Sequence, residues 1–163
     1  MEDDRVYVSL TNDPLNPSHI MDLVRSPEAG AIVLFAGTTR NNFQGNHKYD
    51  GLGQVLTFEG RTVIHLDYEA YLEMASPSLK KIATAGKMKW GLFGVAVTHR
   101  LGRVPIGEES ILIAVSAAHR REAWDAAEWI LEEVKAKTEI WKRESYADPS
   151  QEPVWKENKD VSK

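Results

Sequence analysis

Apolar and polar residues follow one another along this chain in patterns that predict a series of strands and helices. Alternating or continuous apolar runs predict strands over residues 5–10, 31–36, 54–58, 62–71, 92–99 and 110–117. Apolar positions at helical spacing predict helices over residues 17–25, 72–85 and 121–137. This order of elements indicates a single α+β domain, residues 1–163, with its helices packed on one face of a sheet.

The polar segments between these elements are interpreted as irregular structure. Residues 41–53 are rich in Asn and Gly and are typical of a mobile loop. Glu59-Gly60 is the expected turn of a hairpin, and residues 102–109 are a predicted turn because they contain Gly and Pro. Residues 144–163 form a predicted polar tail, in which Trp155 is the large apolar anchor.

Composition and charge narrow the classes of function. The chain has 163 residues and a formal net charge of −4, which argues against a general nucleic-acid binder because such proteins usually carry a basic excess. Cysteine is absent and the five histidines are scattered, so we expect no disulfide, no metal and no cofactor. No apolar run approaches the roughly 20 residues that span a bilayer, and the acidic first residues are unlike a signal peptide. We therefore expect a cytoplasmic (cytosolic) protein.

Two segments carry candidates for binding a small anion. Arg40 follows a buried strand, where loops often carry function, and its planar guanidinium suits phosphate. His119 and Arg120 precede the last predicted helix, whose free backbone N–H groups favour negative charge. The ordinary alternatives are a surface arginine in a turn, and a capping histidine beside a solvated arginine. If these residues bind an anion, we expect the three side chains to converge on one spot.

Lysines among apolar residues close the same helical pattern. Lys135 lies four residues after Leu131 and borders the apolar stripe, and Lys142 follows Ile140-Trp141. An amine in apolar surroundings loses charge and becomes reactive. The ordinary alternative is that the helix dipole favours lysine at a C-terminus. An anion site and reactive lysines, joined by one helix, suggest chemistry on a small phosphorylated substrate.

Five blocks of sequence point to a known family. They are FAGTTRNN at residues 35–42, LDYEAY at 66–71, HRLG at 99–102, SAAHR at 116–120 and KAKTEIWKRE at 135–144. In this order they resemble the large, catalytic subunit of molybdopterin synthase, and the resemblance extends from about Val6 to Trp155. Five ordered blocks are far more specific than one short motif.

The resemblance implies an α/β hammerhead fold with a mixed, mostly antiparallel sheet. It also implies a homodimer in which each copy binds a small ubiquitin-like sulfur-carrier subunit, giving a heterotetramer. The carrier's C-terminal Gly-Gly ends in a thiocarboxylate, and the complex is a sulfurtransferase of molybdenum cofactor biosynthesis. It converts cyclic pyranopterin monophosphate (precursor Z) into molybdopterin by installing two sulfurs as a dithiolene. The absence of cysteine agrees with sulfur delivered by a partner.

Residue roles carry over by motif. Lys135 and Lys142 match the catalytic lysines, and the implied substrate-binding residues are Arg40, His119, Arg120, Lys135 and Lys142. The family also uses a basic tail residue that reaches into the neighbouring subunit's pocket, for which Lys156 and Lys159 are the candidates. Residues 46–61 form a longer segment than the family pattern leads us to expect.

Two alternative functions use the same residues differently. One is a small phosphate-ester hydrolase that uses Arg40 and His119 without a partner. The other is a non-catalytic adaptor that only docks a ubiquitin-like tail. Turnover without a partner would favour the hydrolase, and tail binding without a pterin product would favour the adaptor.

Overall fold

A computed structural model describes residues 4–49, 52 and 55–158, without the side chains of 42–49 and 55–60. At the centre of the molecule is a four-stranded sheet. Its strands are β1 (Val6–Thr11), β2 (Ala31–Thr38), β5 (Gly94–Arg100) and β7 (Glu109–Ala117). Their order in the sheet is β1-β5-β7-β2. β1 is parallel to β5, and the other neighbours are antiparallel. The sheet is therefore mixed and mostly antiparallel, as expected.

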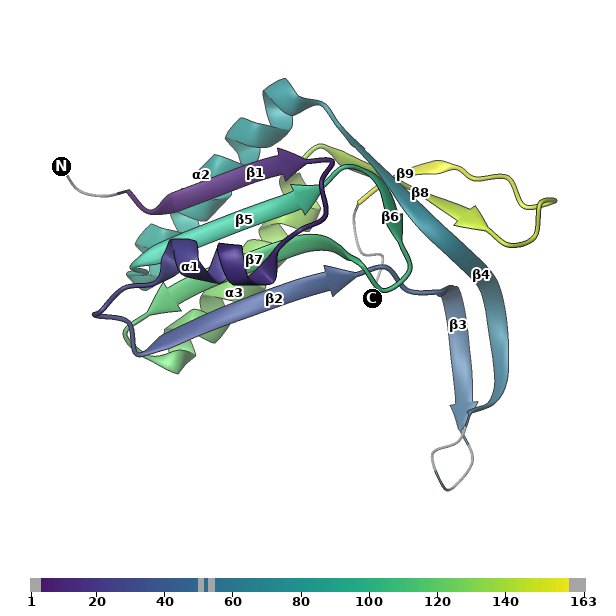
Figure 1. The fold of residues 1–163 in the computed structure, drawn as a ribbon, viewed down its shortest axis with the longest axis horizontal. Helices are drawn as coiled ribbons and strands as arrows, with labels where there is room; N and C mark the ends of the chain where they lie inside the picture. The colour runs from purple at the N-terminus through teal and green to yellow at the C-terminus, as the bar shows by residue number, and fades with distance from the viewer. Residues whose placement is uncertain (1–3, 50–51, 53–54, 159–163) are drawn as a thin grey trace.

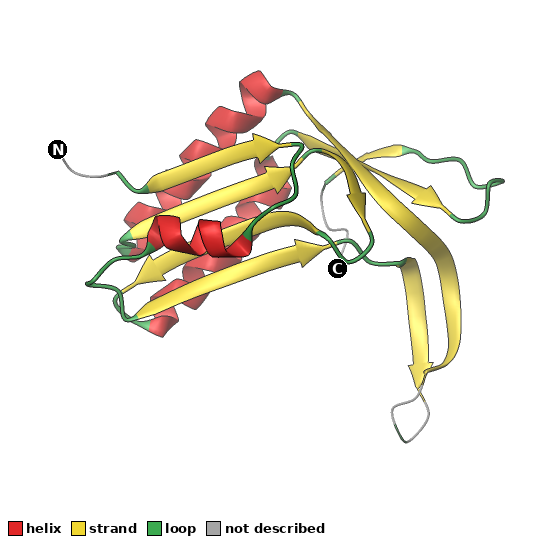
Figure 2. Ribbon diagram, in the orientation of Figure 1, coloured by secondary structure: helices red, strands yellow, loops and turns green. Residues whose placement is uncertain are grey.

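Helices cover both faces of this sheet, which corrects the expectation that all of them pack on one face. They are α1 (Pro17–Val24), α2 (Leu72–Trp90) and α3 (Arg120–Lys137). The two long helices, α2 and α3, pack together on one face, where the buried side chains of Leu79 and Ile130 join those of the strands. The short α1 lies on the opposite face with Ile20 buried against the sheet (Figure 2). Fully burying one such aliphatic side chain contributes about 1.5–3 kcal/mol, so these contacts are the main source of stability.

A second sheet projects from one end of the first (Figure 1). It consists of β3 (Asn42–Tyr49), β4 (Val55–Ala70), β8 (Ile140–Tyr146) and β9 (Trp155–Glu157), and β6 (Gly102–Pro105) also pairs with β4. All these pairs are antiparallel. β4 is 16 residues long; its first part pairs with β3 and its second part with β6 and β8. One long strand thus joins the projecting hairpin to the rest of the molecule.

The sequence-based interpretation of this second sheet is wrong in three places. Residues 42–49 of the expected mobile loop form β3, while 50, 51 and 53 lie outside the described residues. Glu59-Gly60 is not a turn, because it lies inside β4. Residues 102–105 of the expected turn form β6. These strands are specified by backbone pairing with distant neighbours, which polar, Gly-containing sequences do not reveal.

The segment after α3 also differs from expectation. Thr138 has extended backbone angles (φ −90°, ψ 134°) and ends the helix after Lys137. Residues 140–146 form β8, so Lys142 lies on a strand and not in the helix that carries Lys135. The predicted polar tail contributes the end of β8 and all of β9. Ile140, Trp141 and Tyr146 explain this strand, because β-branched and aromatic side chains favour pleated surfaces.

Candidate active site

One end of the first sheet, here called the junction end, is where the second sheet begins. β1, β2 and β5 end there and β7 starts there. Arg40 lies in the connection from β2 to β3, with its side chain exposed. The Thr39 N–H donates to the Glu108 carbonyl at 3.1 Å, and the Gly107 N–H donates to the Thr39 carbonyl at 2.9 Å. These bonds hold Arg40 beside the turn between β6 and β7.

Lys135 and Lys142 lie at the same end, on different elements. α3 packs along β7 and β2, and its 18 residues span about 27 Å, so its last turn reaches the junction end with Lys135. Lys142 is the third residue of β8, which begins soon after α3. Both lysines are half-buried. The structure therefore brings Arg40, Lys135 and Lys142 to one end of the sheet.

His119 and Arg120 lie at the opposite end of the sheet, here called the far end. The register pairs the last residue of β7 with the first residue of β2, so about 23 Å of strand separates them from Arg40. Both side chains are exposed, and His119 occupies the N-cap position of α3 without a side-chain capping bond. The expectation that the three side chains converge within one chain is wrong, because β2 and β7 are antiparallel and carry them at opposite ends.

Lys142 shares one face of the second sheet with other polar side chains. Its cross-strand neighbours are Tyr68 on β4 and Lys156 on β9, and like charges directly opposite are unfavourable in a sheet. Glu144, buried two residues along β8, accepts a hydrogen bond from the Tyr146 hydroxyl at 2.7 Å and lies 3.8 Å from the Lys156 ammonium. Burial and the contact with Glu144 raise the pKa of Tyr146. Glu144 thus offsets part of the positive charge around Lys142.

The other face of this sheet carries an ion cluster that sequence reasoning missed. An Asp67 carboxylate oxygen lies 3.3 Å from Nε2 of His65 and 3.3 Å from Nη2 of Arg143, and the second oxygen lies 3.8 Å from Nε of Arg103. The Arg143 guanidinium lies over the Trp155 ring, 4.8 Å from its centroid. These residues come from β4, β6, β8 and β9. The cluster therefore ties together the strands that surround Lys142.

Two residues of the HRLG block, His99 and Arg100, pack at the junction end. His99 is 1% exposed, and its ring lies edge-on to Tyr68 at 4.9 Å between centroids. Burial lowers the pKa of His99 to about 4. Arg100 ends β5, and its Nη1 donates to Oε2 of Glu108 at 2.5 Å. Because the Glu108 carbonyl also holds the Arg40 loop, this pair braces that loop.

Several buried polar atoms at the junction end have no hydrogen-bond partner among the described residues. They are Thr39 Oγ1, Arg100 Nε, Thr138 Oγ1 and Glu139 Oε2. Thr39 precedes Arg40, and Thr138 and Glu139 lie between the two lysines in the chain. Leaving one such group unpaired costs roughly 1–3 kcal/mol, so they are rare in folded proteins. Ser116 Oγ and Glu122 Oε2 at the opposite end of the sheet also lack a partner in the described part of the chain, so both ends carry buried polar groups that a polar ligand or partner can satisfy.

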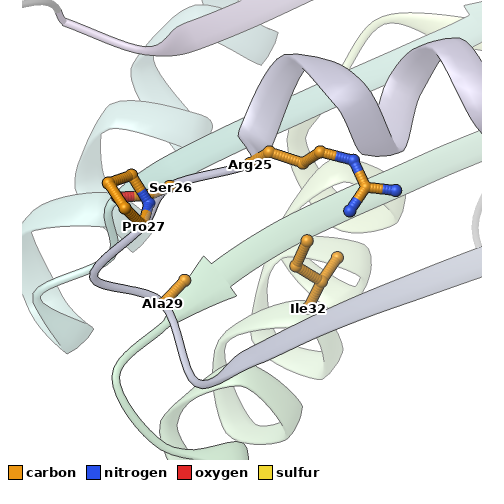
Figure 3. A pocket seen from close by; sticks show the side chains of 5 residues that line it. All are labelled: Arg25, Ser26, Pro27, Ala29 and Ile32. Carbon is orange, nitrogen blue, oxygen red and sulfur yellow. The ribbon is translucent and has the colours of Figure 1, made fainter.

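Two surface cavities lie away from these residues. One of about 310 Å³ between α1 and β2 is lined by Arg25, Ser26, Pro27, Ala29 and Ile32 (Figure 3). The other, of about 560 Å³, lies between β1 and α1. None of the five predicted site residues lines either cavity.

Across residues 4–49, 52 and 55–158, no group of His, Asp or Glu is placed to hold a metal ion. The helices of that described part are too short or too polar to cross a membrane.

Comparison with known proteins agrees with the sequence motifs. Residues 10–137 match a family model described as MoaE protein. The molybdopterin synthase catalytic subunit of Pyricularia oryzae is 49% identical over 158 residues, covering 97% of this chain and 78% of that protein. Molybdopterin synthase from Staphylococcus aureus has a similar structure, with a TM-score of 0.75, 28% identity, and 90% of this chain and 94% of that chain covered. A complex of subunits 1 and 2 of molybdopterin-converting factor from Helicobacter pylori shares the fold, with a TM-score of 0.60, 20% identity, and 88% and 90% of the two chains covered.

Proposed function

This chain belongs to the MoaE protein family, and from that membership we propose that it is the catalytic subunit of a molybdopterin synthase. It acts as a sulfurtransferase that converts cyclic pyranopterin monophosphate into the dithiolene of molybdopterin. The observation that carries the proposal is the match to a molybdopterin synthase catalytic subunit along nearly the whole chain. We propose that the protein acts in the cytosol.

The sulfur comes from a partner in this proposal. The chain has no cysteine and so offers no thiol of its own to carry sulfur. A small ubiquitin-like carrier with a C-terminal Gly-Gly thiocarboxylate supplies it, and the Helicobacter pylori protein of the same fold, a two-subunit complex, supports a second subunit. An extended Gly-Gly tail suits main-chain recognition, in which backbone hydrogen bonds hold the peptide. Two copies of this chain and two carriers form the proposed heterotetramer.

The junction end supplies the reacting groups. Lys135 and Lys142 project from α3 and β8 at the place where buried polar atoms lack partners. Their amines act as general acid and base, or stabilise the charge that develops on the tetrahedral intermediate when sulfur leaves the carrier's acyl carbon. Arg40 contributes the guanidinium for the substrate's phosphate or the polar edge of the pterin.

His119 and Arg120 enter this site only from a second copy of the chain. Within one copy the far end is about 23 Å of strand away from Arg40, which no arginine side chain spans. In a homodimer that places the far end of one copy against the junction end of the other, the open start of α3 meets Arg40 and completes an anion site. Light scattering should show a dimer at micromolar concentration; a monomer would remove His119 and Arg120 from the site.

Reconstitution tests the proposed activity directly. The purified chain is incubated with thiocarboxylated carrier and precursor Z, and the product is identified by mass. The matched control is the same carrier ending in an ordinary carboxylate, which has no sulfur to give and should yield no product. Hydrolysis of the phosphate ester of precursor Z without any carrier would establish the hydrolase instead. Carrier binding with no pterin product would establish the adaptor.

A further inference from the structure

A buried histidine connects the C-terminal tail to the strand that carries Lys142. Nδ1 of His99 lies 2.8 Å from the Arg100 carbonyl oxygen, and its Nε2 lies 3.3 Å from Nδ2 of Asn158. The His99 ring also makes a T-shaped contact with the Tyr68 ring, with 4.9 Å between the ring centroids. The proposed reaction so far gives this histidine no role, although a fully buried imidazole with three partners is a specific arrangement.

These contacts fix the position of the imidazole proton. A carbonyl oxygen only accepts, so Nδ1 of His99 carries the hydrogen and donates it to the Arg100 carbonyl. Nε2 then has a free lone pair, which accepts a hydrogen bond from the Asn158 side-chain amide. Burial lowers the pKa of His99 to about 4, so the ring is neutral near pH 7 and this pattern of donors and acceptors persists.

Asn158 directly follows β9, a short strand at the edge of the second sheet. β9 is only three residues long, and its side chains are half-buried or exposed. The Asn158 N–H donates to the Ile140 carbonyl at 3.0 Å, which continues the pairing of β9 with β8. The contacts of Trp155 and Lys156 with β8 are partly exposed and therefore weak. The side chain of Asn158 contacts His99, which is fully buried.

The segment held in this way lies directly beside Lys142. The register pairs Lys142 with Lys156 on one side and with Tyr68 on the other. His99 contacts the ring of Tyr68, which lies opposite Lys142, and binds Asn158, which lies opposite Ile140, two residues along β8 from Lys142. Movement of β9 would change the surroundings of the Lys142 amine, because β9 is the backbone neighbour of β8 on that side and its whole strand would move.

We propose that the hydrogen bond between His99 and Asn158 is a latch that holds β9 on β8 and thereby positions the Lys142 amine for sulfur transfer. The inference rests on the proposed function for its catalytic part, but the latch itself is a property of the free protein. His99 and Asn158 are positioning residues, since neither is placed to touch the reacting atoms. The latch therefore predicts a change in turnover that is separate from any change in folding.

Asn158→Ala is the direct test, with Val154→Ala as the control because Val154 is a 62% exposed residue just before β9. Amide hydrogen exchange is measured on the free protein, and kcat and KM are measured with thiocarboxylated carrier and precursor Z. Losing one hydrogen bond should speed exchange of the Asn158 and Lys142 region about fivefold to tenfold. We expect kcat to fall by a similar factor, with KM for the pterin and the melting temperature nearly unchanged, and no effect of Val154→Ala.

A pair of conservative substitutions at His99 separates the latch from simple packing. Glutamine places a side-chain oxygen near the position of Nε2 and still accepts from Asn158, whereas asparagine imitates only Nδ1 and does not reach. His99→Gln should therefore retain slow exchange and most of kcat, and His99→Asn should behave like Asn158→Ala. If both variants lose kcat and slow exchange equally, in proportion to their loss of thermal stability, His99 is only a packing residue. That result would overturn the proposal.

The outcomes separate the latch from the enzyme activity. Faster exchange in Asn158→Ala with unchanged kcat would show a tail contact that does not position Lys142, and the proposal would fail. Unchanged exchange would show that no latch exists. If the wild-type protein makes no molybdopterin at all, the proposed function fails, while the exchange experiment still decides whether His99 and Asn158 hold β9.

Discussion

The two ends of the first sheet present different kinds of functional group. The junction end combines Arg40, Lys135 and Lys142 with buried polar atoms that lack partners and with a neutral histidine behind them. The far end presents the exposed His119 and Arg120 at a helix start without a side-chain capping bond, beside Ser116 Oγ and Glu122 Oε2, which are buried and unpartnered among the described residues. One end is thus built like a reaction site, and the other like a simple anion contact.

This difference explains why one chain is not enough for the proposed site. Amines that exchange protons need partly dry, polar surroundings, which the contact between the two sheets creates at the junction end. A helix start needs only free N–H groups and access for its ligand. Because α3 spans about 27 Å between the two ends, the proposed anion contact and the lysine in its last turn can reach one substrate only across two copies.

The largest expected effect is at the junction end. Lys135→Ala should reduce molybdopterin formation by about 10²–10⁴-fold, the usual contribution of a general acid or base. Folding should be retained, because the side chain is half-buried at the edge of the core. The amount of molybdopterin formed after a fixed time, identified by mass, measures turnover. Circular dichroism verifies that the protein is folded. The control is Lys137→Ala, whose 62% exposed side chain pairs with Glu133, and it should be mild. Near-normal turnover by a folded Lys135→Ala protein would remove this lysine from the chemistry.

The buried imidazole at the junction end also predicts a loss of stability in acid. The pKa of His99 is about 4 in the folded protein and near 6.5 in the unfolded chain, so the unfolded state binds the proton more tightly. This contribution is fully present above about pH 6.5 and is lost as the pH falls toward 4. Between about pH 8 and about pH 5 the free energy of unfolding should drop on the order of 2 kcal/mol more in wild type than in His99→Gln. Urea titrations at several pH values measure the difference, and parallel curves for the two proteins would contradict it.

The fold was predictable from sequence where burial shapes the residue pattern. Residues 31–36 and 110–117 are nearly continuous apolar runs because β2 and β7 lie between helices on both faces, and they were identified correctly. β3, β6 and β9 have no such pattern. They depend on pairing with β4 and β8, whose positions the sequence alone does not give.

The candidate site was predictable only as separate pieces. Motifs identified Arg40, Lys135 and Lys142, but the position of Lys142 on a strand opposite Tyr68 follows from the pairing of β4 with β8. The same pairing makes the Asp67 cluster, whose members Asp67 and Arg143 are 76 residues apart in sequence. Convergence of Arg40 with His119 was expected because both lie at element ends, and the antiparallel register of β2 and β7 excludes it within one chain.

A mixed dimer tests the comparison between the two ends. Arg40→Ala and Arg120→Ala should each weaken use of precursor Z about tenfold or more, because each removes a charge-assisted hydrogen bond. If one site combines Arg40 of one copy with Arg120 of the other, a dimer of the two variants contains one intact site and one doubly altered site. Refolding the variants together should then restore activity toward a quarter of wild type or more. With both residues acting from one chain, every site stays defective and mixing restores nothing.

The smallest expected effect is in the C-terminal tail. Comparing two substitutions there shows which lysine enters the site of the neighbouring copy. Lys156 contacts Glu144 of the same chain and pairs with Lys142 in the sheet, while Lys159 lies outside the described residues. An ion pair with one side chain 41% exposed contributes about 0–1 kcal/mol, so Lys156→Ala should change kcat/KM less than about threefold. Lys159→Ala should be the more damaging of the two if a tail residue enters the neighbouring site. Loss of more than tenfold with Lys156→Ala, measured on a protein of normal melting temperature, would instead place Lys156 against the substrate.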